Sequence, residues 1–245
     1  MSPMRSRSLF GPGGPLSAAT AATKLAIGLI AGSVIAWLLP QEWAVRFALS
    51  PELMVHQYAL WQPLTYGFIE TSPTGVIFGA LILWSVGGAL EMQWGPRRLA
   101  VFAIGVTALA GLLTAALSLL WPDFLRGVYA GGTVMTTAVW VAYGWALGRL
   151  QTGFWGLPLT GNALAAIGVG FVALHAAFAR SIVPVIPEIL AIAFAYVYVK
   201  VGTPRVLVLR LRQWRLQRQL RARSRHLRVI SRDRNTDSGS DRYIH

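Results

Sequence analysis

Long apolar runs alternate with short polar segments along most of the chain. The runs cover residues 22–39, 75–90, 99–120, 131–147, 159–178 and 183–201. Each is close to the ~20 residues that an α-helix needs to cross a bilayer, and the shorter runs can extend into flanking aromatic residues. The pattern therefore predicts an all-α polytopic membrane protein with six transmembrane helices in one bundle.

The polar segments divide the chain further. Residues 1–21 predict a flexible cytoplasmic arm, residues 22–201 the membrane domain, and residues 202–245 a basic amphipathic cytoplasmic tail. Residues 41–74, between the first two runs, mix charged side chains with Trp and Tyr. This mixture is typical of the headgroup zone, so it predicts an interfacial first loop.

Composition supports the membrane class and narrows the chemistry. The chain is 55% hydrophobic and 13% charged, whereas soluble domains carry about 25% charged residues. It has no cysteine, which excludes disulfides and thiolate metal sites. Its membrane domain holds two histidines, His56 and His175, without paired carboxylates nearby in the sequence. We therefore expect neither a metal nor a cofactor.

The distribution of positive charge predicts the orientation. Arg97, Arg98, Arg149 and the C-terminal basic cluster fall on one side of the six-helix topology, together with Arg5 and Arg7. The positive-inside rule assigns this side to the cytoplasm. Both termini are therefore expected to be cytoplasmic.

Residues 87–98 predict a short polar hinge between the second and third runs. Gly95 permits a tight turn, and Pro96 can open the next helix because its missing N–H costs nothing there. Glu91 lies at the end of an apolar helix, where a carboxylate needs partners. We expect Glu91 to accept hydrogen bonds from neighbouring donors and to be structural.

This hinge resembles the junction between the second and third helices of the rhomboid family of intramembrane serine proteases. The resemblance rests on Glu91, Trp94, Gly95 and Arg98. It implies a rhomboid-like six-helix bundle in which these four residues are structural.

The first loop carries a second part of the resemblance. The stretch Trp61-Gln62-Pro63-Leu64-Thr65 is similar to the Trp-Arg-x-x-Thr motif of the rhomboid first loop, with Gln62 in place of the arginine. Trp61 and Thr65 are thus also implied to be structural.

The resemblance does not extend to the catalytic residues. Rhomboid proteases use a serine on helix four and a histidine base on helix six, while a histidine and an asparagine on helix two stabilise the oxyanion. Here Thr133 takes the serine's position, Pro187 lies near the place of the missing histidine, and Gly75 and Gly79 stand at the oxyanion positions. The resemblance therefore implies a pseudoprotease, which is not an enzyme.

Inactive members of the rhomboid superfamily bind transmembrane clients or partner subunits. By resemblance, we expect this chain to bind a transmembrane partner or to act as a subunit or assembly factor of a membrane complex. One alternative is a divergent protease with Thr133 as nucleophile and His175 as base. A second is a small transporter or channel, although the apolar runs hold few ionisable groups that could relay an ion.

Glu188 has two interpretations. It lies near the start of the last apolar run, where the helix dipole favours a carboxylate that faces water or headgroups. Alternatively, it makes a polar contact with a bound transmembrane partner, because ionisable groups within membrane segments usually have a purpose.

The tail combines an apolar stripe with many arginines. Leucines at positions 209, 216, 220 and 227 fall on one helical face. The residues expected to meet anionic headgroups, or else a partner protein, are Arg210, Arg212, Trp214, Arg215, Arg218 and Arg221. Such a helix is typical of a membrane surface, where each basic residue contributes ~1 kcal/mol. Nucleic acid is not expected as a partner.

Overall fold

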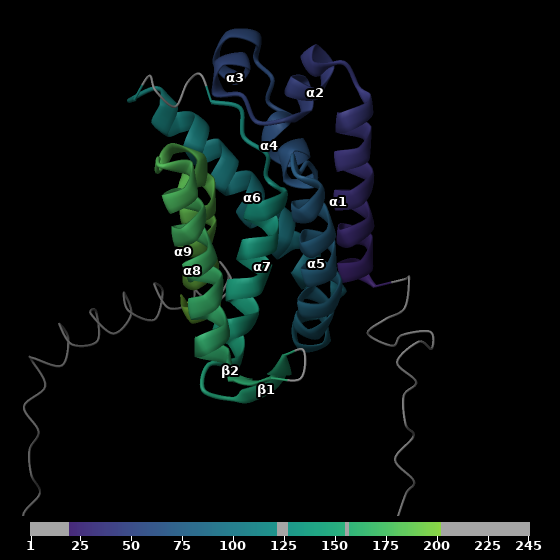
Figure 1. The fold of residues 1–245 in the computed structure, drawn as a ribbon, viewed down its shortest axis with the longest axis vertical. Helices are drawn as coiled ribbons and strands as arrows, with labels where there is room; N and C mark the ends of the chain where they lie inside the picture. Colours follow the sequence, from purple (N-terminus) through teal and green to yellow (C-terminus); the bar gives the residue numbers. More distant parts are fainter. Residues whose placement is uncertain (1–19, 122–126, 155–156, 202–245) are drawn as a thin grey trace, which may run out of the picture. The chain divides into compact units, whose positions relative to one another are not determined.

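The computed structural model describes residues 20–121, 127–154 and 157–201. These residues form a bundle of helices that stand side by side, with short helices gathered at one end (Figure 1). The predicted arm, except for its last two residues, and the predicted tail lie outside the described residues.

Five helical segments in the described part of the chain are long and apolar enough to cross a membrane. They are α1 (Ala21–Leu38), α5 (Pro73–Trp94), α6 (Pro96–Ser118), α8 (Gly161–Ala179) and the segment Val183–Lys200. The last consists of a 3₁₀ turn, η3 (Val183–Val185), followed by α9 (Ile186–Val201). The prediction of an all-α polytopic membrane protein is confirmed.

A shorter helix, α7 (Gly132–Leu147), lies at the centre of the bundle. It packs against α5, α8 and α9, and eleven of its 16 residues are buried. At the contact with α8, a Cβ atom on Gly144 would lie 2.6 Å from the Ala165 amide nitrogen. The absence of a side chain there therefore allows the two helices to approach closely.

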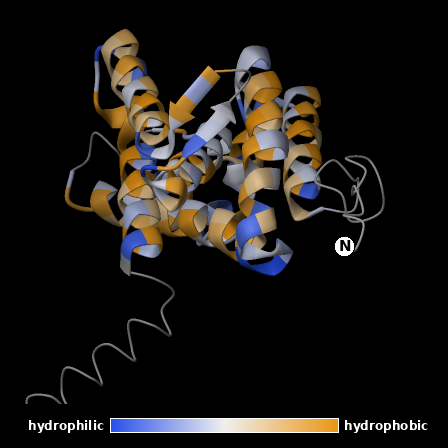
Figure 2. Ribbon diagram, turned by 90° about the horizontal axis from the view of Figure 1, so that it is seen from below, coloured by the Kyte–Doolittle hydropathy of each residue, from blue (hydrophilic) through white to orange (hydrophobic). Residues whose placement is uncertain are grey.

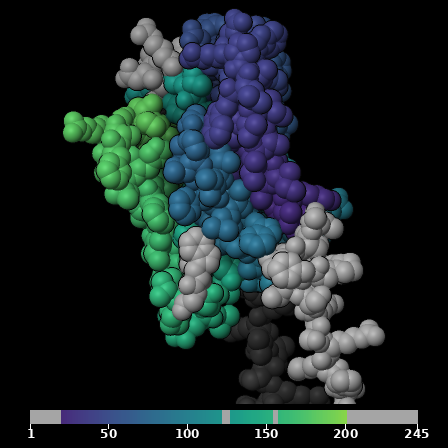
Figure 3. Space-filling model, turned by 45° about the vertical axis from the view of Figure 1, so that its right-hand side comes forward, coloured from purple at the N-terminus to yellow at the C-terminus, as the bar shows by residue number. Residues whose placement is uncertain are grey.

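The remaining helices surround α7 and expose apolar side chains. Helix α1 lies beside α5 along its length (Figure 3). Hydrophobic residues cover the outer faces of the helices as well as their inner faces (Figure 2). Ile27, Phe78, Val101 and Phe171 are each more than half exposed, which suits surfaces that contact lipid chains.

The first loop is anchored to the bundle by buried polar side chains. It forms the short helices α2 (Gln41–Phe47), α3 (Pro51–Gln57) and α4 (Gln62–Thr65) and the 3₁₀ turn η1 (Tyr66–Phe68). Three of its polar side chains, those of Gln62, Tyr66 and Glu70, are buried. Hydrogen bonds to the backbone compensate for the burial of these three side chains. The interfacial position of the loop stays a prediction.

Tyr66 shows how this anchoring works. Its hydroxyl donates a hydrogen bond of 2.6 Å to the carbonyl of Thr107 in α6. Burial raises the pKa of the Tyr66 phenol far above its usual range, so the hydroxyl stays protonated and remains a donor. The loop is thereby fixed to the third membrane-spanning helix.

The hinge is shorter than the sequence predicts. Helix α5 continues through Trp94, and the joint consists of Gly95 alone, with φ +82°. Pro96 is the first residue of α6, as predicted. Glu91 therefore lies within a helix, where its carboxylate accepts hydrogen bonds from the amides of Ala21 (3.1 Å) and Ala22 (2.8 Å). The predicted hydrogen bonds of Glu91 are confirmed.

A β-hairpin between α7 and α8 was not predicted. Strands β1 (Gln151–Phe154) and β2 (Leu157–Thr160) pair antiparallel. Residues 159 and 160, expected to be helical, belong to β2, and the Thr160 hydroxyl caps α8 by accepting a hydrogen bond from the Ala163 amide. The apolar run masked this boundary because short strands and helices share apolar character.

Both ends of the described bundle lie at one end of the molecule. The hydrogen bonds of Glu91 place the start of α1 beside the end of α5. Arg98, in the first turn of α6, donates a hydrogen bond of 3.2 Å to the Tyr198 hydroxyl near the end of α9. The cytoplasmic assignment of this end stays a prediction.

Replacing Glu91 by alanine should lower thermal stability. The change leaves two amides at the start of α1 without their acceptor, which costs ~1–3 kcal/mol. The measurement is the midpoint of thermal unfolding in mild detergent. Glu42→Ala, at an exposed position of α2, is the matched control. An unchanged midpoint for Glu91→Ala would show that this carboxylate does not hold α1 to α5.

Candidate functional site

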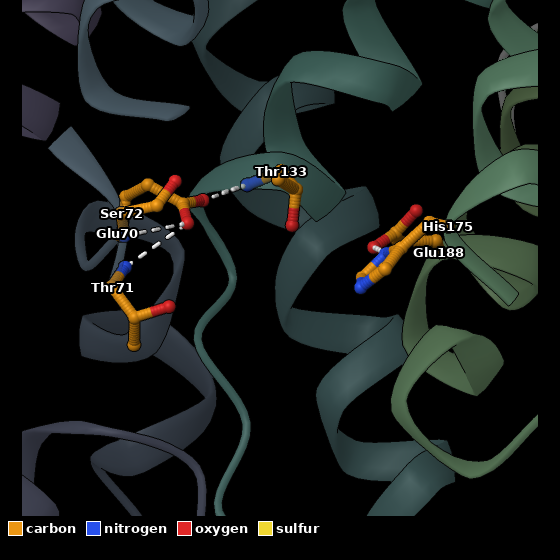
Figure 4. Close-up of polar contacts among 6 residues, drawn as sticks. All are labelled: Glu70, Thr71, Ser72, Thr133, His175 and Glu188. Atoms are coloured by element: carbon orange, nitrogen blue, oxygen red, sulfur yellow. Dashed lines mark hydrogen bonds and ion pairs between the residues drawn. The ribbon is translucent and has the colours of Figure 1, made fainter. Parts of the chain in front are cut away.

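A group of polar side chains gathers at the end of the bundle that carries the first loop (Figure 4). Its charged or ionisable members are Glu70, next to the start of α5, His175 of α8 and Glu188 of α9. Thr133, in the first turn of α7, lies between Glu70 on one side and the pair His175–Glu188 on the other. Four separate segments thus contribute to one site.

The Glu70 carboxylate is buried and accepts hydrogen bonds on both oxygens. Oε1 accepts from the amides of Thr71 (3.0 Å) and Ser72 (3.4 Å). Oε2 accepts from the amide of Thr133 (3.0 Å). With 5% of its surface exposed, this carboxylate is held by backbone donors.

Glu70 completes a cap on α7. The first amides of a helix have no partner within the helix. Here the Gly131 amide donates to the carbonyl of Tyr66 (2.9 Å) and the Gly132 amide to the carbonyl of Ile69 (2.9 Å). Together with the Thr133 amide on Glu70, three successive amides at the start of α7 are satisfied by one stretch of the first loop.

The backbone of Glu70 is also fixed. Its amide donates to the Ser33 hydroxyl (2.9 Å), and its carbonyl accepts from the Trp37 indole nitrogen (3.1 Å). Both partners belong to α1. The position of this carboxylate is therefore set by α1, α7 and the turn into α5.

The glycines singled out by the resemblance make room for these groups. A Cβ atom on Gly75 would lie 2.8 Å from the Glu70 Cδ. One turn further along α5, a Cβ atom on Gly79 would lie 2.9 Å from Leu29 and 3.2 Å from the Thr136 hydroxyl. Gly75 and Thr133 thus meet at Glu70, whereas Gly79 faces the contact between α1 and α7.

Glu188 pairs with His175. Its Oε1 lies 2.9 Å from the His175 Nδ1. Glu188, Thr133 and Glu70 all line the same polar cavity. Pro187 precedes Glu188 in the first turn of α9.

The burial of Glu188 corrects one interpretation. Its side chain is 5% exposed, whereas that of His175 is 46% exposed. Glu188 does lie in the first turn of its helix, as predicted. However, a carboxylate facing water or headgroups is wrong, because the packing of α8 and η3 against α9 encloses it and His175 supplies its partner.

Two hollows meet at Thr133. The polar cavity, about 580 Å³, is lined by residues that include Glu70, Tyr129, Thr133, His175 and Glu188. The lateral groove, about 360 Å³, runs along α5, α7 and α8 and includes Phe78, Ile82, Trp140 and Gly168. Thr133, Thr137 and Phe171 line both hollows, so they adjoin one another.

Residues 23–201 match the family described as eukaryotic integral membrane protein (DUF1751). The match covers more than half of the chain. The chain belongs to this family. No curated protein matches its sequence. The protein is thus an integral, multi-pass membrane protein of this family.

The first-loop motif of this DUF1751 protein ties the loop together. The Trp61 indole donates to the carbonyl of Arg46 (3.0 Å), and the Thr65 hydroxyl donates to the carbonyl of Phe47 (2.8 Å). The buried Gln62 accepts from the Ser50 amide (2.9 Å) through its side-chain oxygen. All three side chains thus connect α4 to the chain around α2.

The hinge motif forms a separate cluster at the other end of the bundle. The ring of Trp94 packs against Phe102 and Tyr198, and the Arg98 guanidinium lies 4.7 Å from the centre of the Trp94 ring. Gly95 provides the turn between them. This cluster makes no contribution to the polar cavity.

No metal site is found in the part of the chain that the structure describes, where no three His, Asp or Glu side chains gather to hold an ion. The predicted lipid- or partner-binding residues of the tail, residues 210–221, lie outside that part. Their assignment stays a prediction.

Glu70 is the main site residue that the sequence reasoning missed. The signal was present, because the rule that drew attention to Glu188 applies equally to an acid placed just before an apolar run. Its neighbours in the sequence, the aromatic and polar residues of the first loop, favoured an interfacial position instead. Only the fold shows that residues 70 and 133 meet.

Replacing Glu70 by alanine should destabilise the bundle. Three amides would lose their acceptor at once, so we expect a loss of at least ~1–3 kcal/mol. Glu70→Gln should cost less, because an amide oxygen can still accept from Thr133. The measurement is thermal unfolding in detergent, with Glu52→Ala on the exposed face of α3 as control. Equal midpoints for Glu70→Ala and this control would contradict the capping role.

Proposed function

We propose that this protein is a rhomboid-like pseudoprotease that binds a transmembrane partner in the lateral groove. It serves as a subunit or assembly factor of a membrane complex. The observation that carries the proposal is the hydrogen bond between the Glu70 carboxylate and the Thr133 amide. The arguments concern the topology, the chemistry around Thr133 and the shape of the groove.

The topology supports the rhomboid-like part of the proposal. The start of α1 and the end of α9 lie at the same end of the bundle, so the chain crosses the membrane an even number of times. Five segments qualify as spans by length and composition, and α7 supplies the sixth crossing. At 16 residues, α7 is about 24 Å long, and its ends are extended by the capping segment and the hairpin.

The surroundings of Thr133 oppose hydrolysis. In acyl transfer, the negative charge that develops on the carbonyl oxygen must be stabilised by free hydrogen-bond donors. The amide of the residue in the nucleophile's position is a natural donor, but here it is already bonded to the Glu70 carboxylate. A second anion at this place would be repelled. Gly75, at one of the two expected oxyanion positions, has no side chain that could donate in place of the Thr133 amide.

The order of the polar groups also opposes nucleophilic activation. In a hydrolase triad, a histidine lies between the nucleophile and the acid, because the imidazole takes the proton and the carboxylate orients it. Here the His175 Nδ1 is paired with Glu188, and no hydrogen bond among the described residues joins the His175 ring to Thr133. The divergent-protease alternative through His175 therefore lacks the contact between base and nucleophile.

The lateral groove suits a transmembrane helix. It lies between α5 and α8, with α7 at its base, and exposes Phe78 and Phe171. Small residues such as Gly75 and Gly168 line it, and small residues allow helices to pack closely in membranes. Because α5 and α8 belong to membrane spans, a protein occupant must itself present an apolar, membrane-embedded surface.

The charge beside the groove favours a cationic residue on the partner. The polar cavity holds two buried carboxylates, while its lining includes neither lysine nor arginine. Glu70 accepts hydrogen bonds from backbone amides, and Glu188 is paired with the half-exposed His175. A buried carboxylate remains costly within a membrane. A lysine or arginine near the end of a partner helix would offset that cost, with Glu188 as the contact.

The purified protein in liposomes should not cleave a model transmembrane substrate that an active rhomboid protease cleaves under the same conditions. Thr133→Ser should be equally inactive, because Glu70 still occupies the amide and no base reaches the hydroxyl. The measurement is product formation on gels. Fluorophosphonate labelling of the wild type that is lost in Thr133→Ala would contradict the pseudoprotease assignment.

A transmembrane test peptide should bind in the lateral groove. The probe is a polyleucine helix with one lysine near the end that meets the polar cavity, and the control peptide carries glutamine there. A photo-crosslinker at Phe78 should capture the lysine peptide, whereas one at Ile27, an exposed residue of α1, should not. Glu188→Gln should reduce capture of the lysine peptide several-fold. Equal capture at both positions would show that the groove has no binding role.

A further inference from the structure

The end of the bundle opposite the polar cavity holds an arginine in a fixed position. The Arg98 guanidinium lies over two rings, 4.7 Å from the centre of Trp94 and 5.4 Å from that of Tyr198. Its Nε donates to the Tyr198 hydroxyl (3.2 Å). The rings themselves are locked, because Phe102 packs against both, at 5.2 and 4.9 Å between centroids.

The rest of the guanidinium remains available. Arg98 is exposed, and no carboxylate among residues 20–121, 127–154 and 157–201 forms an ion pair with it. Glu91, one helical turn before Gly95, is engaged with the start of α1. The two Nη groups therefore retain donors in a planar fork.

The position of Arg98 defines what can reach it. Gly95 joins two membrane-spanning helices, α5 and α6, so the first turn of α6 lies at a membrane surface. The phosphates of lipid headgroups lie at the same depth, and Trp and Tyr are enriched there.

Other positive features surround the fork. Arg97 precedes Arg98, and both lie in the first turn of α6, where no side chain caps the helix. Uncapped amides and the helix dipole favour an anion at that point. Lys200 follows Tyr198 in the last turn of α9. Apart from the Glu91 carboxylate, which is bonded to the start of α1, these charged side chains at the joint are basic.

We propose that Arg98, held by Trp94 and Tyr198, binds the phosphate of an anionic phospholipid. A guanidinium fork pairs with two phosphate oxygens through charge-assisted hydrogen bonds. The aromatic rings fix the side chain before the lipid arrives, so little rotamer freedom is lost on binding. The lipid then occupies the joint of α5, α6 and α9, and its acyl chains lie along their exposed apolar faces.

The full-length protein in detergent tests this proposal. Native mass spectrometry counts bound phosphatidylglycerol against phosphatidylcholine supplied at equal concentration. The wild type should prefer phosphatidylglycerol. Arg98→Gln should weaken that binding about tenfold or more, through loss of charge-assisted hydrogen bonds. Arg97→Gln removes the same charge from the neighbouring exposed position and should weaken binding less than about fivefold, as expected of a single surface charge.

Further variants distinguish binding by the guanidinium fork from general electrostatic attraction, and a competition experiment distinguishes lipid from free phosphate. Arg98→Lys keeps the charge but should bind as weakly as Arg98→Gln, because an ammonium forms no planar fork. Tyr198→Phe keeps Arg98 but removes its Nε acceptor and should weaken binding about two- to fivefold, so it serves where Arg98→Gln does not fold. Equal losses for Arg97→Gln and Arg98→Gln, or wild-type binding by Arg98→Lys, would overturn the proposal. Displacement of the lipid by inorganic phosphate alone would overturn the assignment to lipid.

Discussion

The capped start of α7 is the interaction on which the rest of the structure depends. This helix begins within the bundle, where Gly131 and Gly132 are buried. Backbone groups buried in apolar surroundings must find partners. The first loop supplies them as the carbonyls of Tyr66 and Ile69 and the carboxylate of Glu70. Helices α5, α8 and α9 all pack on α7. The contact that fixes the start of α7 therefore also fixes the helix against which these three pack.

The same carboxylate links architecture to chemistry. A helix start is a favourable place for an anion, and in a hydrolase such a place can stabilise a reacting oxygen. Here the protein's own side chain fills it, and a Cβ atom on Gly75 would collide with that side chain. In the proposed function, this one hydrogen bond therefore both stabilises the fold and prevents hydrolysis. The Glu188–His175 pair remains at the site, and in the proposed function it is the contact for a transmembrane partner.

The two ends of the bundle differ in charge. Buried carboxylates lie at the end that carries the first loop, and exposed basic residues lie at the joint of α5 and α6. In the two proposals, the buried acids meet a cationic residue of a membrane-embedded partner, whereas the exposed arginine at the helix joint meets lipid headgroups. Each end is thus suited to a different class of ligand.

The sequence by itself determined the membrane class, the approximate extent of the long helices, the turn at Gly95 and the need of Glu91 for partners. These features follow from local rules, namely hydrophobic length, the conformational freedom of glycine and the cost of a charge in an apolar helix. The sequence could not reveal that Glu70 caps α7 or that Glu188 pairs with His175. Nor could it reveal that Arg98 donates a hydrogen bond to Tyr198, one hundred positions away. Only the tertiary structure decided these contacts, because they join segments whose spacing in the chain carries no periodic signal. The short hairpin escaped prediction for a related reason, since its pairing and not its composition distinguishes it from the helix that follows.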